Sequence, residues 1–399
     1  MILKLDMVQS IALAVLVLLF GKFLVERFSV LRKYCIPTPV VGGFIFAILV
    51  LILKQGNILE IELDTTLQKL AMTVFFTSVG FSASLKLLKK GGLKVFIFLA
   101  CAIVLVILQN IVGVSVAKLF NLNALLGLAT GSVPMTGGHG TAAAFGPVME
   151  AAGASGANTV ALAAATFGLV SGSMIGGPIG NHLIIKHDLV NKKKNQKDDF
   201  MEVDQLNGKE RTLIPNNFNL VTVEIIIAMG VGTLISNLFV KAGLTLPSYI
   251  GAMIAGAIIR NISDSTKSFE VPMVEIDLVG GIALSLFLAM ALMGLKLWQL
   301  ADLALPLFVM LFSQVILMYL YANYVTFRAL GKDFDAAVLA AGHCGFGLGA
   351  TPNGIANMTS VTEKFGPSPT AFFVLPLVGS LFIDFFNAGI ITFFINLLA

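Results

Sequence analysis

Two glycine-rich stretches carry most of the side chains that could do chemistry in this sequence. The first, GSVPMTGGHGT, runs from Gly131 to Thr141, and the second, GHCGFGLGATPN, runs from Gly342 to Asn353. Both hold a few Ser, Thr, Asn and His residues inside an otherwise apolar chain. Glycine weakens a helix, and an unpaired backbone group is costly in hydrocarbon. Such stretches are tolerated at membrane depth only where they are buried in protein or line a cavity, so we expect a binding site there.

The first stretch predicts two half-helices around a glycine tip. We expect a half-helix over residues 124–135, a tip from Thr136 to Gly140 and a return helix from Thr141 onward. The return helix would offer free N–H groups and a positive dipole end to an anion, with no basic side chain needed. Close helix packing alone would explain an isolated glycine pair, but not this combination with Pro and Thr. The candidate binding residues are Ser132, Thr136, Gly137, Gly138, His139, Gly140 and Thr141.

The second stretch predicts a similar hairpin, with a helix from Ala336 and a tip from Gly345 to Gly349. Thr351-Pro352-Asn353 opens its return helix, because proline pre-sets the first helical turn. Asn353 and Asn357 would share one face of that helix, where they could line a polar cavity or bond a neighbouring helix. The candidate binding residues are Gly345, Phe346, Gly347, Gly349, Thr351, Asn353 and Asn357.

A few further polar residues complete the candidate site. His139 and His343 are expected in the two tips, where His139 could bind substrate, orient the tip or make a structural hydrogen bond. Asp384 lies deep in the last apolar run with Asn387 three residues on; an intramembrane carboxylate is costly, which favours Na⁺ or ammonium binding over a structural role. The candidate Na⁺ ligands are Thr136, Thr141, Thr351 and Asp384.

The sequence does not favour an enzyme. It has no GxSxG elbow, no HExxH helix and no phosphate loop, and no His pair has metal-ligand spacing with a carboxylate. We therefore expect neither a zinc site nor a cofactor other than a coupling ion. Cys35, Cys101 and Cys344 are an odd number in or near apolar segments, so no disulfide is expected.

Composition identifies a polytopic membrane protein. The 399 residues are 57% hydrophobic and 12% charged, against about 25% charged in soluble domains. The net charge of +4 is small and concentrated on one side of the predicted topology, so nucleic-acid binding is not expected.

Ten apolar runs of roughly spanning length form two sets of five, separated by a charged segment at residues 186–216. The runs lie near residues 7–25, 38–53, 67–85, 93–117, 157–185, 218–240, 247–260, 279–297, 303–327 and 369–398. The two sets are related: Gly131 and Gly342 are 211 positions apart, and Pro37 and Pro247 are 210 apart. The phrases FSASLKLLKKGGL and ALMGLKLWQLADL match at a similar offset. This constancy indicates an internal duplication rather than chance resemblance of Leu-, Ala- and Gly-rich helices.

Basic residues predict the topology. Lys and Arg cluster after the odd-numbered runs, most densely in the 186–216 segment, which places that linker in the cytoplasm and both termini outside. A full crossing by residues 124–151 would move the linker outside, so this stretch must enter and return to its own side. We therefore predict an all-α membrane protein with two inverted repeats of five transmembrane helices, each with a re-entrant hairpin.

At these residues the chain resembles the bacterial sodium/glutamate symporter family over essentially its whole length. The resemblance is carried by GLATGSVPMTGGHGTAAAF, ATFGLVSGSMIGGP, LSLFLAMALMGLKLWQLADLALP, DAAVLAAGHCGFGLGATPNGIANM and TEKFGPS. The family's loop motifs fall on residues 137–140 and 345–349, including Leu348. Thr136 stands where the family often has Ser, and either hydroxyl can bind Na⁺.

The resemblance implies Na⁺-coupled uptake of L-glutamate across the bacterial inner membrane by a homodimer. It implies alternating access with an elevator-like motion of core helices (67–185 and 279–399) against scaffold helices (1–53 and 217–260). The alternatives are a Na⁺ symporter for another small anion and a gated anion channel, which would conduct without Na⁺ dependence.

Overall fold

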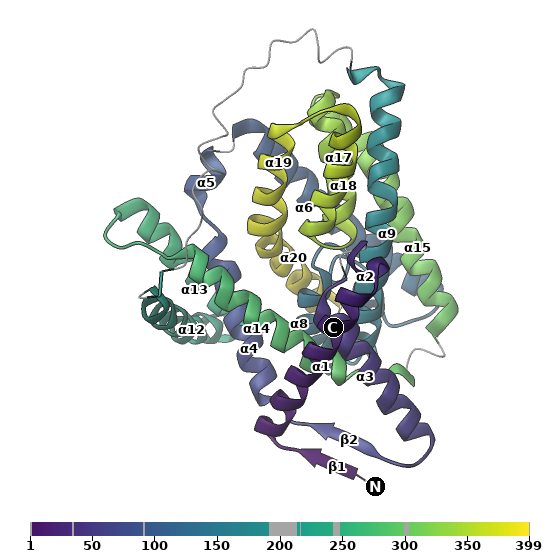
Figure 1. Cartoon of the computed structure of the whole chain (residues 1–399), viewed down its shortest axis with the longest axis vertical. Helices are drawn as coiled ribbons and strands as arrows, with labels where there is room; N and C mark the ends of the chain where they lie inside the picture. The colour runs from purple at the N-terminus through teal and green to yellow at the C-terminus, as the bar shows by residue number, and fades with distance from the viewer. Residues whose placement is uncertain are drawn as a thin grey trace.

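The computed structural model describes residues 2–33, 36–90, 92–190, 214–215, 217–241, 248–298 and 303–398. Within these ranges each of the ten predicted apolar runs forms a helix (Figure 1). In the first half these helices are α1 (Met7–Arg27), α3 (Thr38–Gln55), α4 (Thr66–Ser82), α6 (Gly92–Leu119) and α9 (Ala157–Lys186). In the second half they are α12 (Asn217–Lys241), α13 (Ser248–Thr266), α14 (Met273–Met293), α15 (Ala304–Tyr321) and the α19–α20 segment described below.

The last apolar run is one long helical segment with a change of winding inside it. It consists of α19 (Pro369–Pro376), the π-helical η3 (Leu377–Phe382) and α20 (Ile383–Leu398). Pro376 cannot donate an i→i−4 hydrogen bond, and the wider π turns follow it directly. A second π segment, η2 (Ala322–Thr326), follows α15 and leads into α16 (Phe327–Ala329).

Shorter helices connect or interrupt the spans. They are α2 (Ser29–Lys33), α5 (Leu85–Lys90), α7 (Ala124–Leu128), α8 (Gly138–Ala151), α17 (Phe334–Leu348) and α18 (Thr351–Phe365). Eight of the described helices are long and apolar enough to cross a membrane. The two remaining predicted spans are α4, which has only 17 residues, and α13, which carries Arg260 and Asp264 near its end.

The prediction of a purely helical chain misses one small sheet. The strand β1 (Ile2–Leu5) pairs in parallel with β2 (Glu60–Leu63), and Lys4 forms an ion pair of 3.1 Å with Glu62. The pairing fastens the N-terminus to the loop between α3 and α4. This ribbon lies at the opposite end of the molecule from the C-terminal end of α9 (Figure 1).

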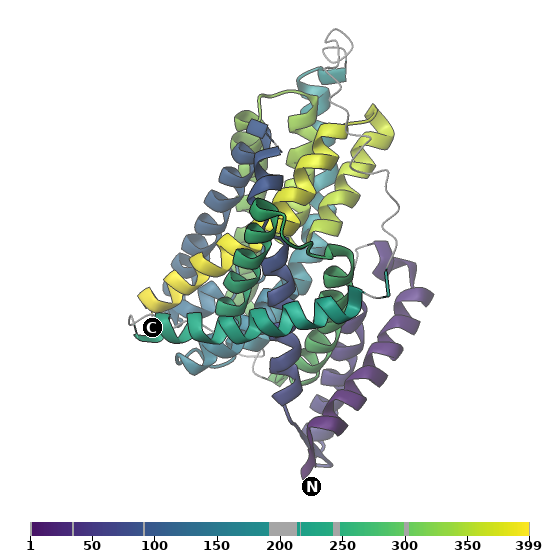
Figure 2. The same cartoon turned by 90° about the vertical axis from the view of Figure 1, so that its left-hand side faces the viewer.

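The helices pack as two groups. In the first, called here the wall group, α4 packs on α13 and α14, α14 also packs on α3, and the pairs α1–α3 and α12–α13 are closely joined. In the second, the hairpin group, α9 packs on α8, α17 and α18, and α6 packs on α7, α15 and α20. Figure 2 shows α1 and α3 set apart from the yellow C-terminal helices. Contact between the groups is limited and runs mainly through α4 and α14.

Candidate functional site

The first hairpin is broken by an irregular turn longer than predicted. Regular helix ends with α7 at Leu128, and residues 129–137 form consecutive turns before α8 begins at Gly138. The predicted half-helix over 124–135 is therefore wrong beyond Leu128. Pro134 has no N–H for the carbonyl four residues before it, and the Gly137 N–H bonds to the Ser132 carbonyl at 3.0 Å, five residues back.

The second hairpin is broken more sharply than predicted. The helix α17 continues to Leu348, through the expected tip glycines, and only Gly349 and Ala350 separate it from α18. A Cβ on Gly345 would lie 2.3 Å from the Gly354 nitrogen, so this glycine serves close packing of α17 on α18 rather than a turn. The return helix begins at Thr351 with Pro352 in its first turn, as the sequence predicted.

The two tips meet at residues that are 211 positions apart. The Thr136 hydroxyl lies 3.4 Å from the Gly347 carbonyl oxygen, which it faces as a donor. Gly138 has a positive φ of 61°, and a Cβ at this position would lie 2.9 Å from the Gly349 carbonyl oxygen. Glycine is thus required at Gly138 both for its backbone conformation and for the close approach of the second tip.

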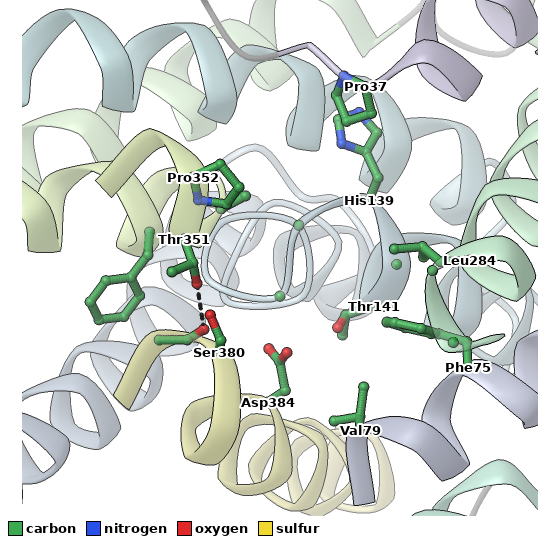
Figure 3. Close-up of a pocket in the computed structure, with 18 of the residues that line it drawn as sticks. Pro37, Phe75, Val79, His139, Thr141, Leu284, Thr351, Pro352, Ser380 and Asp384 are labelled. Carbon is green, nitrogen blue, oxygen red and sulfur yellow. Dashed lines mark hydrogen bonds between the residues drawn. The ribbon is translucent and has the colours of Figure 1, made fainter. Parts of the chain in front are cut away.

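A cavity of about 390 Å³ lies beside the meeting tips, between the wall group and the hairpin group. The wall side is formed by residues of α4 and α14, among them Ser78, Ser82 and Asp277. The other side is formed by both tips and by the η3–α20 segment (Figure 3). The described residues that line it include the two carboxylates of Asp277 and Asp384 and neither lysine nor arginine.

Ten of the sixteen predicted site residues line this cavity. They are Thr136, Gly137, Gly138, His139, Gly140, Thr141, Phe346, Gly349, Thr351 and Asp384. The structure brings these residues together from three segments that are far apart in the sequence. The other six, which lie outside the lining, are Ser132, Gly345, Gly347, Asn353, Asn357 and Asn387.

Oxygen atoms converge on one part of the cavity. The Asp384 carboxylate points into it between Ser380 and Thr141 (Figure 3), and none of the described residues donates a hydrogen bond to it. Thr141 is 5% exposed, and its hydroxyl has no hydrogen-bond partner among the described residues. The Thr351 hydroxyl donates to the Gly379 carbonyl of η3 at 2.7 Å, which fixes the start of α18 to the segment that carries Asp384.

The two histidines have different positions. His139 lines the cavity, is 5% exposed, and its Nε2 lies 2.9 Å from the Thr166 hydroxyl of α9. His343 was predicted in the second tip, and this is wrong. It lies inside α17, because the regular helix continues past it to Leu348. There it bonds Thr326 of η2 at 2.9 Å through Nδ1 and stacks on Phe346, so it supports the fold away from the cavity.

The two asparagines of α18 face α9. Asn353 Nδ2 donates to the Leu169 carbonyl at 3.1 Å and to the Ser173 hydroxyl at 2.6 Å. Asn357 Nδ2 donates to the Gly172 carbonyl at 2.9 Å. The arrangement matches the helix–helix alternative of the sequence analysis rather than the polar-cavity alternative.

Polar residues of α6 and α15 support the first tip, although they were not among the predicted site residues. Gln109 accepts a hydrogen bond of 2.8 Å from Thr136 and donates one of 2.6 Å to the Gly347 carbonyl, so it joins both tips. Gln314 donates to the Gln109 carbonyl at 2.8 Å. The sequence does contain a sign of this role, since Gln109 and Asn110 are adjacent inside a long apolar helix. Buried amides at membrane depth need hydrogen-bond partners.

Both return helices begin without a side-chain cap. Neither α8, after Gly137, nor α18, after Ala350, has a capping side chain, whereas Asp333 caps α17. Among the described residues, the N–H groups of Gly138, His139 and Gly140 at the start of α8 make no backbone hydrogen bond. At the start of α18 only the Thr351 N–H is left, because Pro352 has no N–H and the Asn353 N–H bonds to the Ala350 carbonyl at 3.0 Å. Two positive helix ends and one set of oxygen ligands can together bind an anion and a hard cation without basic side chains.

Most of the chain forms apolar helices, and two helical hairpins are interrupted beside a polar cavity between two packed groups. This arrangement is typical of a membrane transporter. The protein is a multi-pass membrane protein of this class. A family model described as sodium/glutamate symporter matches residues 3–367. The chain therefore belongs to the sodium/glutamate symporter family.

Individual relatives agree with this assignment. The sodium/glutamate symporter of Escherichia coli (strain K12) is 43% identical over 397 residues, which cover 98% of both chains. The sodium/glutamate symporter of Haemophilus influenzae is 42% identical over 385 residues, which cover 96% of this chain and 95% of the relative. Among solved structures, the sodium proton antiporter MjNhaP1 from Methanocaldococcus jannaschii matches over 98% of this chain and 97% of its own. Its TM-score of 0.43 and 14% identity are too low to carry an argument.

Proposed function

We propose that this protein is a secondary transporter that couples the uptake of L-glutamate to Na⁺ through the cavity between the hairpin tips. The observation that carries the proposal is the pairing of two uncapped helix N-termini with one unpartnered carboxylate in a single cavity. Glutamate has two carboxylates and one ammonium group. The N–H groups at the start of α8 and the Thr351 N–H at the start of α18 would donate hydrogen bonds to the carboxylates, since the described lining holds neither lysine nor arginine.

Asp384 and the hydroxyls near it form the proposed Na⁺ site. A hard cation prefers oxygen ligands, and a carboxylate is the strongest of these. Thr141 lies beside Asp384 in Figure 3, and Thr351 is held to the same segment through Gly379. Contact of Asp384 with the substrate ammonium is the alternative use of the same carboxylate.

Several contacts support inverted repeats. In a two-fold arrangement, equivalent residues can touch only near the axis, and Thr136 with Gly347 and Gly138 with Gly349 are such pairs. The α1–α3 crossing is at Gly21 and Gly42, and residues 211 and 210 positions later, Gly232 and Ala252, form the α12–α13 crossing. These pairs favour two re-entrant hairpins related by an axis between their tips.

We infer an elevator-like motion in which the hairpin group moves along the wall group. The predicted moving core, residues 67–185 and 279–399, includes most of α4 and α14. Their packing on α13 and α3 favours assigning both to the fixed scaffold instead. The cavity would then have one fixed wall and one moving wall.

We further infer a homodimer in the bacterial inner membrane, with both termini outside and a cytoplasmic linker at residues 186–216. The homodimer is carried over from the family resemblance. Residues 191–213 and 216 lie outside the described residues, but the N-terminal ribbon and the end of α9 lie at opposite ends of the molecule, which supports the orientation (Figure 1).

Orientation is tested by cysteine labelling of intact cells, in a variant whose Cys35, Cys101 and Cys344 are replaced by alanine. A membrane-impermeant maleimide should label a cysteine at Asn57 and leave one at Asn195 unlabelled until the cells are opened. Labelling of residue 195 from outside would contradict the inverted topology.

Function is tested by radiolabelled glutamate uptake into proteoliposomes with and without an inward Na⁺ gradient. Uptake should require the Na⁺ gradient, and unlabelled glutamate outside should drive counterflow. Na⁺-independent flux without counterflow would instead indicate an anion channel. Na⁺-driven uptake of a different small anion, with no glutamate uptake, would reject the assigned substrate.

A further inference from the structure

Three fully buried polar side chains meet behind the first hairpin tip, outside the cavity. They are Asn110 of α6, Ser132 of the irregular turn and Asn387 of α20, and each is 0% exposed. The Ser132 N–H donates to Asn110 Oδ1 at 2.8 Å, and Asn387 Nδ2 donates to the Ser132 carbonyl at 3.2 Å. Both amides therefore converge on the backbone of a single residue.

Each of these side chains retains an atom with no hydrogen-bond partner among the described residues. The atoms are Ser132 Oγ, Asn387 Oδ1 and Asn110 Nδ2. An unpaired polar group costs several kcal/mol in hydrocarbon. Three unpaired polar atoms at one place, two of them oxygens, indicate a binding site for a polar molecule or an ion.

The turn that carries Ser132 also leaves two backbone carbonyls without a backbone hydrogen bond. The Thr130 carbonyl would normally accept from the residue four positions on, which is Pro134 and has no N–H. The Val133 carbonyl would normally accept from Gly137, whose N–H bonds to Ser132 instead. Neither carbonyl accepts a backbone hydrogen bond from the described residues. The sequence Thr-Gly-Ser-Val-Pro thus frees the carbonyls of Thr130 and Val133, which flank Ser132 in the sequence.

We propose that this cluster is a second Na⁺ site, separate from the one at Asp384, with ligands Ser132 Oγ, Asn387 Oδ1 and the freed turn carbonyls. Neutral hydroxyl, amide and carbonyl oxygens suit a hard monovalent cation, whereas a divalent cation would need carboxylates. The inference rests on the proposed Na⁺-coupled function. Asn387 lies one helical turn from Asp384 on α20, so the site adjoins the cavity from which the ion would enter.

A water molecule is the competing occupant. Water could accept from Asn110 Nδ2 and donate to Asn387 Oδ1 and Ser132 Oγ, which would satisfy all three atoms. A cation leaves the Asn110 donor to another partner and takes the Ser132 and Asn387 oxygens as ligands. The two occupants differ in one measurable property: only the cation makes binding depend on Na⁺ concentration.

Ser132→Ala is the diagnostic variant, because it removes one proposed ligand and breaks no hydrogen bond between described residues. In proteoliposomes, the Na⁺ concentration for half-maximal glutamate uptake should rise on the order of tenfold, as when a metal site loses a supporting group. The Hill coefficient for Na⁺ should fall toward one, and the glutamate KM at saturating Na⁺ should not change. Thr392→Val is the matched control, since among the described residues this buried hydroxyl of α20 bonds only the Ala388 carbonyl of its own helix. Its Na⁺ curve should coincide with the wild-type curve.

A binding measurement keeps the test independent of transport. The thermal unfolding midpoint of the purified full-length protein is followed against NaCl, at constant ionic strength with KCl and without glutamate. Ser132→Ala should need on the order of tenfold more Na⁺ than wild type for the same stabilisation. Coincident Na⁺ curves for Ser132→Ala and wild type, in uptake and in unfolding, would overturn the second site and favour water. Wild-type uptake without any Na⁺ dependence would instead reject the proposed function itself, so the two failures are distinguishable.

Discussion

The first hairpin reaches the cavity through the irregular turn 129–137, whereas the second reaches it through two residues between regular helices. The first tip is held from behind by Gln109 and Asn110 of α6, and the return helix of the second is held by asparagines that bond α9. Two hairpins with matching sequence positions thus differ in how they are broken and in which helix supports them.

The tips also differ in chemistry at equivalent positions. Residues 211 positions apart pair His139 with Ala350, Gly140 with Thr351, and Thr141 with Pro352. The first tip therefore offers an imidazole and an unpartnered hydroxyl, whereas the Thr351 hydroxyl is engaged with Gly379. The shared feature is the uncapped helix start, and the side chains around it are not shared. Such a site suits an amino acid with a carboxylate at each end and an ammonium group at one end.

The largest effect is expected at the point where the tips meet. Gly138→Val should abolish transport while the protein still reaches the membrane, because the backbone has a positive φ and the new side chain would collide with the Gly349 carbonyl. Gly389→Val is the matched control, since no described atom lies within 4 Å of a Cβ at this position. Glutamate uptake, normalised to reconstituted protein, distinguishes the two, and near wild-type uptake by Gly138→Val would place the site elsewhere.

The next effect compares Asp384 with Ser173, which lies 211 positions earlier in the chain. Asp384→Asn keeps the side-chain volume and removes the charge, so the apparent Na⁺ affinity should fall about 10- to 100-fold. The glutamate KM at saturating Na⁺ should change much less. A loss of glutamate affinity with an unchanged Na⁺ curve would assign Asp384 to the substrate ammonium.

Ser173→Ala provides the comparison for that variant. The Ser173 hydroxyl accepts from Asn353 and donates to the Leu169 carbonyl, so its loss should weaken helix packing and leave the Na⁺ curve in place. An equal shift of Na⁺ affinity in both variants would mean that both positions contribute to ion binding, and the contrast between Asp384 and Ser173 would be wrong.

The long spans could be predicted because apolar runs leave few alternatives to helix. The predicted run 218–240 corresponds to α12 at Asn217–Lys241, and 157–185 to α9 at Ala157–Lys186. The tips were predicted less well. Glycine was treated as a helix breaker, yet Gly345 and Gly347 lie inside α17, where they allow close approach to Gly354 and to Leu105 and Met318. Helix propensity is overridden there by packing that no local pattern records.

The sequence predicted the cavity residues that come from the hairpin tips, but not those that come from α4 and α14. Ser78, Ser82 and Asp277 are separated from the tips by many residues, and nothing in their local sequence indicates that α4 and α14 face the hairpins. The partners of Thr136 were missed for the same reason, since Gln109 joins residues 27 and 238 positions away. Long-range pairing of single polar residues needs the fold itself.

The smallest predicted effect concerns Asn357, where a structural and a binding role make different claims. Asn357→Ala removes the hydrogen bond to the Gly172 carbonyl of α9 and a longer one of 3.3 Å to Ala341. Interhelical hydrogen bonds in membranes are worth about 0.6 kcal/mol on average, and leaving buried carbonyls unpaired adds to the loss, so about 1 kcal/mol of stability should disappear. The thermal midpoint should fall slightly, and neither the Na⁺ curve nor the glutamate KM should move, because Asn357 lies outside the cavity lining. Asn353→Ala should behave in the same way, since it also bonds α9. A clear rise in glutamate KM with an unchanged thermal midpoint would show instead that the asparagines of α18 bind substrate, and their assignment to helix packing would fail.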